Sequence, residues 1–220
     1  MESQLARWRA ALAAGAVRVG WKIGLNDPRL QQHLGLETCV LGHLTLATTI
    51  VPGDAHSLAG GTMVGVEPEV AIHVGRDVPA GAERREVVDA VVGLGAALEV
   101  VDIDAPFDDV ERIVAANVFH RGVLFGMARP ERAGGALDGV TARALRNGNA
   151  VETVDAAAAC GDVAEIVRFV ADTLAACGER LRAGDWIIAG SLTRPLWVKP
   201  DDVVGVDLGP LGSLTLRCTA

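Results

Sequence analysis

Alternating apolar and polar positions predict several β-strands in this chain. The clearest is GVEPEVAIHVG at residues 65–75, in which every second residue is apolar over most of its length. Because successive side chains of a strand point to opposite faces, Glu67 and Glu69 share one face, together with Ala71 and His73. The pattern therefore predicts a strand with one apolar face and one face that carries two carboxylates.

Further elements follow from periodicity and from turn residues. Residues 162–177 form an amphipathic pattern that ends at Gly178, which predicts a helix. A second helix is expected at about 85–97, leading directly into the strand-like ALEVVDID, and Asn147-Gly148 predicts a hairpin turn. Strands are also expected at 17–25, 186–190, 195–199 and 203–208. With no evident linker, we expect a single domain over 1–220, with a short N-terminal helical extension at about 1–16.

Composition narrows the class of function. Half of the 220 residues are hydrophobic and 22% are charged, which suffices for a sizeable core. A net charge of −8, without a basic stripe interleaved with aromatic residues, argues against a nucleic-acid partner. The four cysteines lack CxxC spacing, which is typical of reduced thiols, and no apolar run is long enough for a membrane span. We expect a cytoplasmic protein that acts on small molecules.

The two glutamates of the first strand require an explanation. Side chains two residues apart on a strand lie about 7 Å apart, so Glu67 and Glu69 repel each other unless water or a cation lies between them. Glu99 lies among apolar residues in ALEVV, where an acid needs a partner. Three converging carboxylates suit Mg²⁺, Mn²⁺ or Ca²⁺. The alternatives are a solvated strand face, and an ion pair of Glu99 with one of the eighteen arginines.

Lysine is rare in this chain, which has only Lys22 and Lys199. Lys22 lies in the apolar segment GWKIGL, and a buried ammonium can donate or accept a proton, which arginine cannot do. The alternative is a strand lysine whose amino group reaches solvent. In AGSLTRP, the hydroxyl of Ser191 and the backbone amides around Gly190 are candidates for binding a carboxylate, although the GxSxG motif of hydrolases is missing.

Six segments, taken in order, resemble the 2-keto-4-pentenoate hydratase and 4-oxalocrotonate decarboxylase branch of the fumarylacetoacetase superfamily. They are GWKIGL, VEPEV, ALEVVD, the segment around Asn117, AGDWIIAGSLT and DLGPLGSL. The resemblance implies an α+β fold, with a mixed β-sheet rolled into a barrel-like core and helices outside. It further implies that Mg²⁺ or Mn²⁺ binds to Glu67, Glu69 and Glu99, that Lys22 is the active-site lysine, and that the substrate contacts Asn117, Gly190, Ser191, Leu192 and Thr193.

The function implied by the resemblance is that of a divalent-metal-dependent lyase. Such an enzyme would hydrate a 2-hydroxypenta-2,4-dienoate, or decarboxylate a related small anionic 2-oxo acid, through a metal-stabilised enolate in aromatic catabolism. A homo-oligomer is expected, or a complex with a related hydratase or decarboxylase. The alternatives are a C–C bond hydrolase of acylpyruvate type and a catalytically degenerate metal-binding subunit that pairs with an active relative.

Two departures from the family pattern bear on this choice. Leu46 and Ala47 stand where relatives carry an aspartate, and Ala116-Asn117-Val118-Phe119 stands where they read DNAS. Loss of a carboxylate near the reacting carbon would remove a general acid or base worth about 10²–10⁴ in rate. His43 and His120 are the candidates to replace it.

Overall fold

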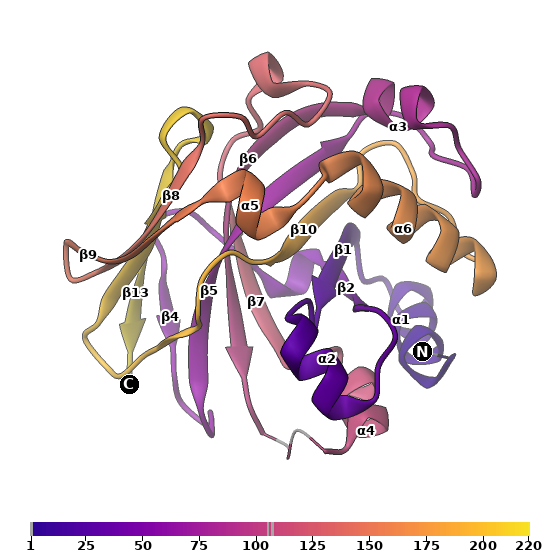
Figure 1. The fold of residues 1–220 in the computed structure, drawn as a ribbon. Helices are drawn as coiled ribbons and strands as arrows, with labels where there is room; N and C mark the ends of the chain where they lie inside the picture. Colours follow the sequence, from indigo (N-terminus) through magenta and orange to yellow (C-terminus); the bar gives the residue numbers. More distant parts are fainter. Residues whose placement is uncertain (1, 105, 107) are drawn as a thin grey trace.

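Two β-sheets form the centre of the fold in the computed structural model, which describes residues 2–104, 106 and 108–220 (Figure 1). The larger sheet is mixed, with the order β2-β1-β10-β5-β6-β7-β3, and β11 also pairs with β5. Its strands are β1 (Arg18–Gly24), β2 (Val40–Thr45), β3 (Thr49–Ile50), β5 (Val64–Val74), β6 (Val91–Asp102), β7 (His120–Phe125), β10 (Trp186–Ser191) and β11 (Leu196–Trp197).

The smaller sheet has five strands in the order β4-β13-β12-β8-β9. They are β4 (Ala55–Ser57), β8 (Thr141–Arg146), β9 (Asn149–Asp155), β12 (Val203–Asp207) and β13 (Ser213–Thr219). Asn147 and Gly148 join β8 to β9 with φ angles of 49° and 82°, which confirms the predicted hairpin turn.

The larger sheet is curled (Figure 1), and a contact between two of its non-neighbouring strands agrees with this shape. Three strand spacings, about 14 Å in a flat sheet, separate β1 from β6. Nevertheless the Nζ atom of Lys22 on β1 lies 2.6 Å from Oε1 of Glu99 on β6. The fold is therefore the α+β arrangement of a curled mixed sheet with outer helices that the resemblance implied (Figure 1).

Most helices lie beside the larger sheet, at the top and right of the view in Figure 1. The helices are α1 (Glu2–Ala13), α2 (Pro28–Leu34), α3 (Arg84–Ala90), α4 (Val110–Ala115), α5 (Ala156–Cys160) and α6 (Val163–Ala176), with short 3₁₀ turns at Leu46–Thr48, Pro130–Arg132 and Gly209–Leu211. The main core joins α6 to both sheets, with Val167 and Leu174 of α6 and Ile72 of β5 fully buried. Among the described residues, no helix has the length and apolarity that a membrane span requires.

The helix predicted at about 85–97 is wrong in its second half. The structure ends α3 at Ala90, and the run from Val91 to Asp102 forms β6, between β5 and β7. A central strand that is buried on both faces reads as a continuous apolar run, which periodicity cannot distinguish from a buried helix. β5 and β6 are antiparallel neighbours, and Glu67 lies directly opposite Glu99.

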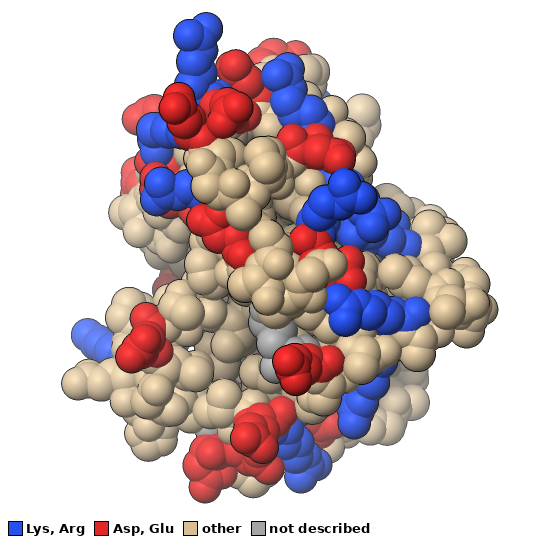
Figure 2. All heavy atoms as spheres, turned by 90° about the vertical axis from the view of Figure 1, so that its right-hand side faces the viewer, with Lys and Arg blue, Asp and Glu red and all other residues tan. Residues whose placement is uncertain are grey.

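Charges of both signs are interspersed on the face that lies to the right in Figure 1, where α1 and α6 are found (Figure 2). The described part of this face carries no continuous basic stripe. The acidic groups among the basic ones would repel a polyanion from this face.

Candidate active site

Three glutamates meet on the face of the larger sheet that is turned away from the main core. Glu67 and Glu69 extend from β5, and Glu99 extends from β6 opposite Glu67. One ligand oxygen from each carboxylate lies within 4.8 Å of the other two. Glu69 and Glu99 are completely buried, so the solvated strand face considered from the sequence does not apply to them.

Each buried carboxylate has one oxygen bonded to protein and one oxygen free. Glu69 Oε2 accepts a hydrogen bond from the Gly190 amide at 2.7 Å. Glu99 Oε1 lies 2.6 Å from Lys22 Nζ and 2.7 Å from His120 Nδ1. Within the described chain, Glu69 Oε1 and Glu99 Oε2 have no hydrogen-bond partner. Buried carboxylate oxygens without partners are costly, and a hard divalent cation between them would satisfy both, so the donor set fits Mg²⁺, Mn²⁺ or Ca²⁺.

The electrostatics of the metal-free site follow from this crowding. Burial, reinforced by the charge of Glu99 and opposed by Lys22, raises the pKa of Glu67 to about 7. Burial and both neighbouring acids raise the pKa of Glu69 well above its usual value. Burial would also raise the pKa of Glu99, but the Lys22 ammonium and the His120 ring together outweigh it and lower that pKa. Without a cation, this crowding therefore favours the protonated forms of Glu67 and Glu69.

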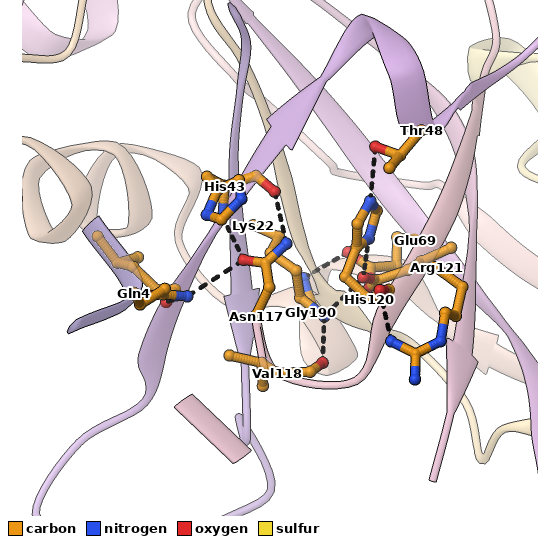
Figure 3. A network of polar contacts seen from close by, with 12 residues as sticks. Gln4, Lys22, His43, Thr48, Glu69, Asn117, Val118, His120, Arg121 and Gly190 are labelled. Atoms are coloured by element: carbon orange, nitrogen blue, oxygen red, sulfur yellow. Dashed lines mark hydrogen bonds and ion pairs between the residues drawn. The ribbon is translucent and has the colours of Figure 1, made fainter. Parts of the chain in front are cut away.

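Lys22 lies inside the site and does not reach bulk solvent, since only 2% of the residue is exposed. Its Nζ atom donates to the Val118 carbonyl at 3.0 Å and forms the 2.6 Å ion pair with Glu99 (Figure 3). Glu99 thus has the cationic partner that its apolar surroundings predicted, but that partner is Lys22 and not an arginine.

A pocket of about 520 Å³ opens beside these groups. Lys22, Glu67 and the segment Ser191–Thr193 line it, with apolar walls from Leu25, Ile103, Val118, Phe119 and Trp197. Its size and its mainly apolar lining, with a few polar groups, are typical of small-molecule sites.

Gly190 bonds Glu69 and precedes Ser191, but it is not among the described residues that line the pocket. The pairing of β10 with β5 shifts register between Ile188 and Ser191, and Gly190 has a φ of 95°. A Cβ atom there would lie 2.6 Å from Nδ2 of Asn26. Only glycine fits this position, from which the amide reaches Glu69.

Of the two histidines and Asn117, only His120 bonds one of the three acids, while His43 and Asn117 bond each other. Neither His43, His120 nor Asn117 is among the described residues that line the pocket. His120 bonds Glu99 through Nδ1 and lies 3.0 Å from Thr48 Oγ1 through Nε2 (Figure 3). Burial, with a contribution from His120, lowers the pKa of His43 to about 4. Sequence reasoning missed Thr48, which lies one residue after the departure at Leu46 and Ala47.

Comparison with known proteins gives a consistent family. No protein-family model matches the chain. The chain is 31% identical over 211 residues to a 2-keto-4-pentenoate hydratase of Paraburkholderia xenovorans, covering 92% of this chain and 77% of the relative. It is 28% identical over 209 residues to a 4-oxalocrotonate decarboxylase of a Pseudomonas species, covering 93% and 80%.

Solved structures agree with this relationship. A 4-oxalocrotonate decarboxylase from Pseudomonas putida G7, complexed with magnesium and adipate, superimposes with a TM-score of 0.87 at 26% identity, covering 98% of this chain and 83% of that one. A fumarylpyruvate hydrolase from Pseudomonas aeruginosa, in complex with Mn²⁺ and pyruvate, shares the fold with a TM-score of 0.70 at 17% identity, covering 92% and 90%. The chain therefore belongs to the 2-keto-4-pentenoate hydratase and 4-oxalocrotonate decarboxylase family.

Proposed function

We propose that this chain is a divalent-cation-dependent lyase that hydrates or decarboxylates a small 2-oxo or 2-hydroxydienoic acid. The observation that carries the proposal is the arrangement of Glu67, Glu69 and Glu99 beside the pocket that Lys22 lines, with two buried carboxylate oxygens that have no partner among the described residues. Family membership supports it, as do the magnesium and adipate bound to the decarboxylase relative.

A divalent cation at this site would supply Lewis-acid stabilisation of the negative charge that develops on such an acid. Glu67, Glu69 and Glu99 would hold the cation. The three carboxylates, one divalent cation and the Lys22 ammonium sum to zero formal charge, so the site can accept an anion at low electrostatic cost.

The protein's own groups account for proton transfer and substrate orientation. Lys22 lines the pocket and is held by two acceptors, so its Nζ is the group available to exchange a proton with the enolised substrate. The segment Ser191–Thr193 would contact the substrate, and the apolar walls would exclude water from its hydrocarbon part. His120 would orient Glu99 from behind, because it bonds the oxygen that also meets Lys22.

A second candidate, a catalytically degenerate metal-binding subunit, is favoured by one observation. Leu46 and Ala47 stand where the resemblance implies an aspartate, and Leu46 is 58% exposed. His43 and His120, expected to replace that acid, lie outside the described lining of the pocket. Such a subunit would bind the cation and an oxalate-like anion without turnover. Hydrolysis of a C–C bond in an acylpyruvate is the neighbouring chemistry to be excluded.

A substrate screen tests the proposal. The chain is incubated with Mg²⁺ or Mn²⁺ and short 2-hydroxydienoates, 2-oxo-enedioates and acylpyruvates, while dienol absorbance, CO₂ and pyruvate are followed. We expect turnover of a dienoate or an enedioate, and its loss in Glu67→Gln. Tight binding of metal and oxalate without turnover of any substrate would favour the degenerate subunit instead.

A further inference from the structure

A chain of hydrogen bonds links the N-terminal helix to the strands around Lys22 (Figure 3). Gln4 of α1 is buried, and its Nε2 donates to Asn117 Oδ1 at 3.1 Å and to the Leu41 carbonyl at 3.0 Å. Asn117 Oδ1 also accepts from the His43 amide at 2.8 Å, and Asn117 Nδ2 donates to the His43 carbonyl at 2.9 Å. Three of the four hydrogen-bonding positions of this carboxamide are therefore used within the protein.

Asn117 begins a turn of unusual backbone conformation. Asn117, Val118 and Phe119 have φ angles of 61°, 55° and 63°. Asparagine tolerates this region, but β-branched and bulky residues such as Val118 and Phe119 seldom adopt it. Such conformations persist only where the surroundings hold them, and they concentrate at functional sites. In this turn the Val118 carbonyl accepts the hydrogen bond from Lys22 Nζ at 3.0 Å.

The backbone of Gly42 on β2 brings Lys22 and Asn117 together. A Cβ atom at Gly42 would lie 2.5 Å from Cγ of Lys22 and 3.0 Å from Oδ1 of Asn117. The stem of the lysine and the carboxamide thus pack against the same point of β2. A displacement of Asn117 would disturb both the packing of the stem and the carbonyl that holds its ammonium.

The geometry points to Asn117, assisted by Gln4, as a positioning residue for Lys22. Its carboxamide fixes the turn at 117–119, so that the Val118 carbonyl and Glu99 Oε1 together hold the ammonium in one orientation. Two acceptors leave the third N–H of Lys22 for the pocket. This role takes the place of the direct substrate contact expected from the sequence. Its catalytic consequence rests on the proposed function, but its structural consequence does not.

The scarcity of lysine makes a test independent of activity feasible. Lys22 is buried and Lys199 is exposed, so ¹⁵N-lysine labelling gives two ammonium groups in different environments, which Lys22→Met assigns. Asn117→Gly removes the carboxamide and tolerates the positive φ. We expect the Nζ hydrogens of Lys22 to exchange with water at least about tenfold faster in this variant, as for the loss of one well-held hydrogen bond.

Asn147→Gly is the matched control. Asn147 also has a positive φ, of 49°, and its side chain also joins two segments, through Asp202 and the Val203 amide in the smaller sheet. This variant should leave the exchange of Lys22 unchanged. Gln4→Leu removes one donor to Asn117 while retaining bulk, and should accelerate exchange in the same direction by a smaller factor. It is the decisive variant if Asn117→Gly does not fold.

Kinetics with a substrate that the protein turns over would distinguish positioning of Lys22 by Asn117 from direct contact between Asn117 and the substrate. Asn117→Gly should lower kcat while the metal Kd stays within a few-fold, and it should add no further loss in a Lys22→Met background. Unchanged exchange of Lys22 in both Asn117→Gly and Gln4→Leu would overturn the inference, as would fully additive losses in the double variant. Faster exchange in a protein that turns over no substrate would uphold the positioning role and count against the proposed lyase.

Discussion

The raised pKa of Glu67 predicts an unusual pH dependence for the metal-free protein. Its pKa is about 7 in the folded state, against an ordinary value of 4.5. Between these values the folded state binds more protons than the unfolded state, so the free energy of unfolding falls as pH rises. From pH 5 to pH 7.5 this single group removes about 2 kcal/mol of stability.

Histidines contribute with the opposite sign and must be separated from this effect. Burial lowers the pKa of His43 from 6.5 to about 4, so the unfolded state binds more protons there and stability rises with pH across that window. The measurement is therefore a difference between the parent and Glu67→Gln, which share His43. Urea unfolding of both proteins with a chelator, at pH 5 and pH 7.5, gives that difference.

We expect Glu67→Gln to be more stable than the parent at pH 7.5 by about 2 kcal/mol more than at pH 5. Saturating Mg²⁺ or Mn²⁺ should stabilise the parent at pH 7.5 and reverse this ranking, because the cation favours the ionised carboxylate. A parent and a variant with parallel pH profiles in the chelator would refute the reasoning. The carboxylate of Glu67 would then be solvated, and the crowding of the three acids would be overstated.

Three further predictions concern the lysine, the histidine behind the metal site and the assembly. Lys22→Met should lower kcat/KM by about 10² or more. Calorimetry should show that metal affinity is retained, because the substitution removes a positive charge near the metal ligands. His120→Ala removes one of the two groups that hold Glu99 Oε1, and titration should show metal affinity weakened by about 10–100-fold, whereas an unchanged Kd would exclude an orienting role. Large apolar side chains are exposed at Met127 and Leu46, and we expect sedimentation to show self-association, not a lone 22.8 kDa species.

The sequence alone determined those features that depend on local pattern. The period of two in residues 65–75 predicted a strand with Glu67 and Glu69 on one face, and these residues form β5. The amphipathic pattern of 162–177 corresponds to α6 at Val163–Ala176, and Asn147-Gly148 makes the hairpin turn. The chemical type of the donor set, three carboxylates that suit a hard divalent cation, also follows from residue identity alone.

Tertiary structure decided whatever depends on contacts between distant segments. Whether the run from Val91 becomes helix or strand is fixed by the neighbouring strands β5 and β7, because a fully buried apolar run carries no distinguishing period. The rolling of the sheet sets Lys22 against Glu99, and pairing register sets Glu99 opposite Glu67. The hydrogen bonds of the Asn117 side chain to α1 and β2 could not be predicted from the sequence either, because its partners lie 74 and 113 residues away along the chain.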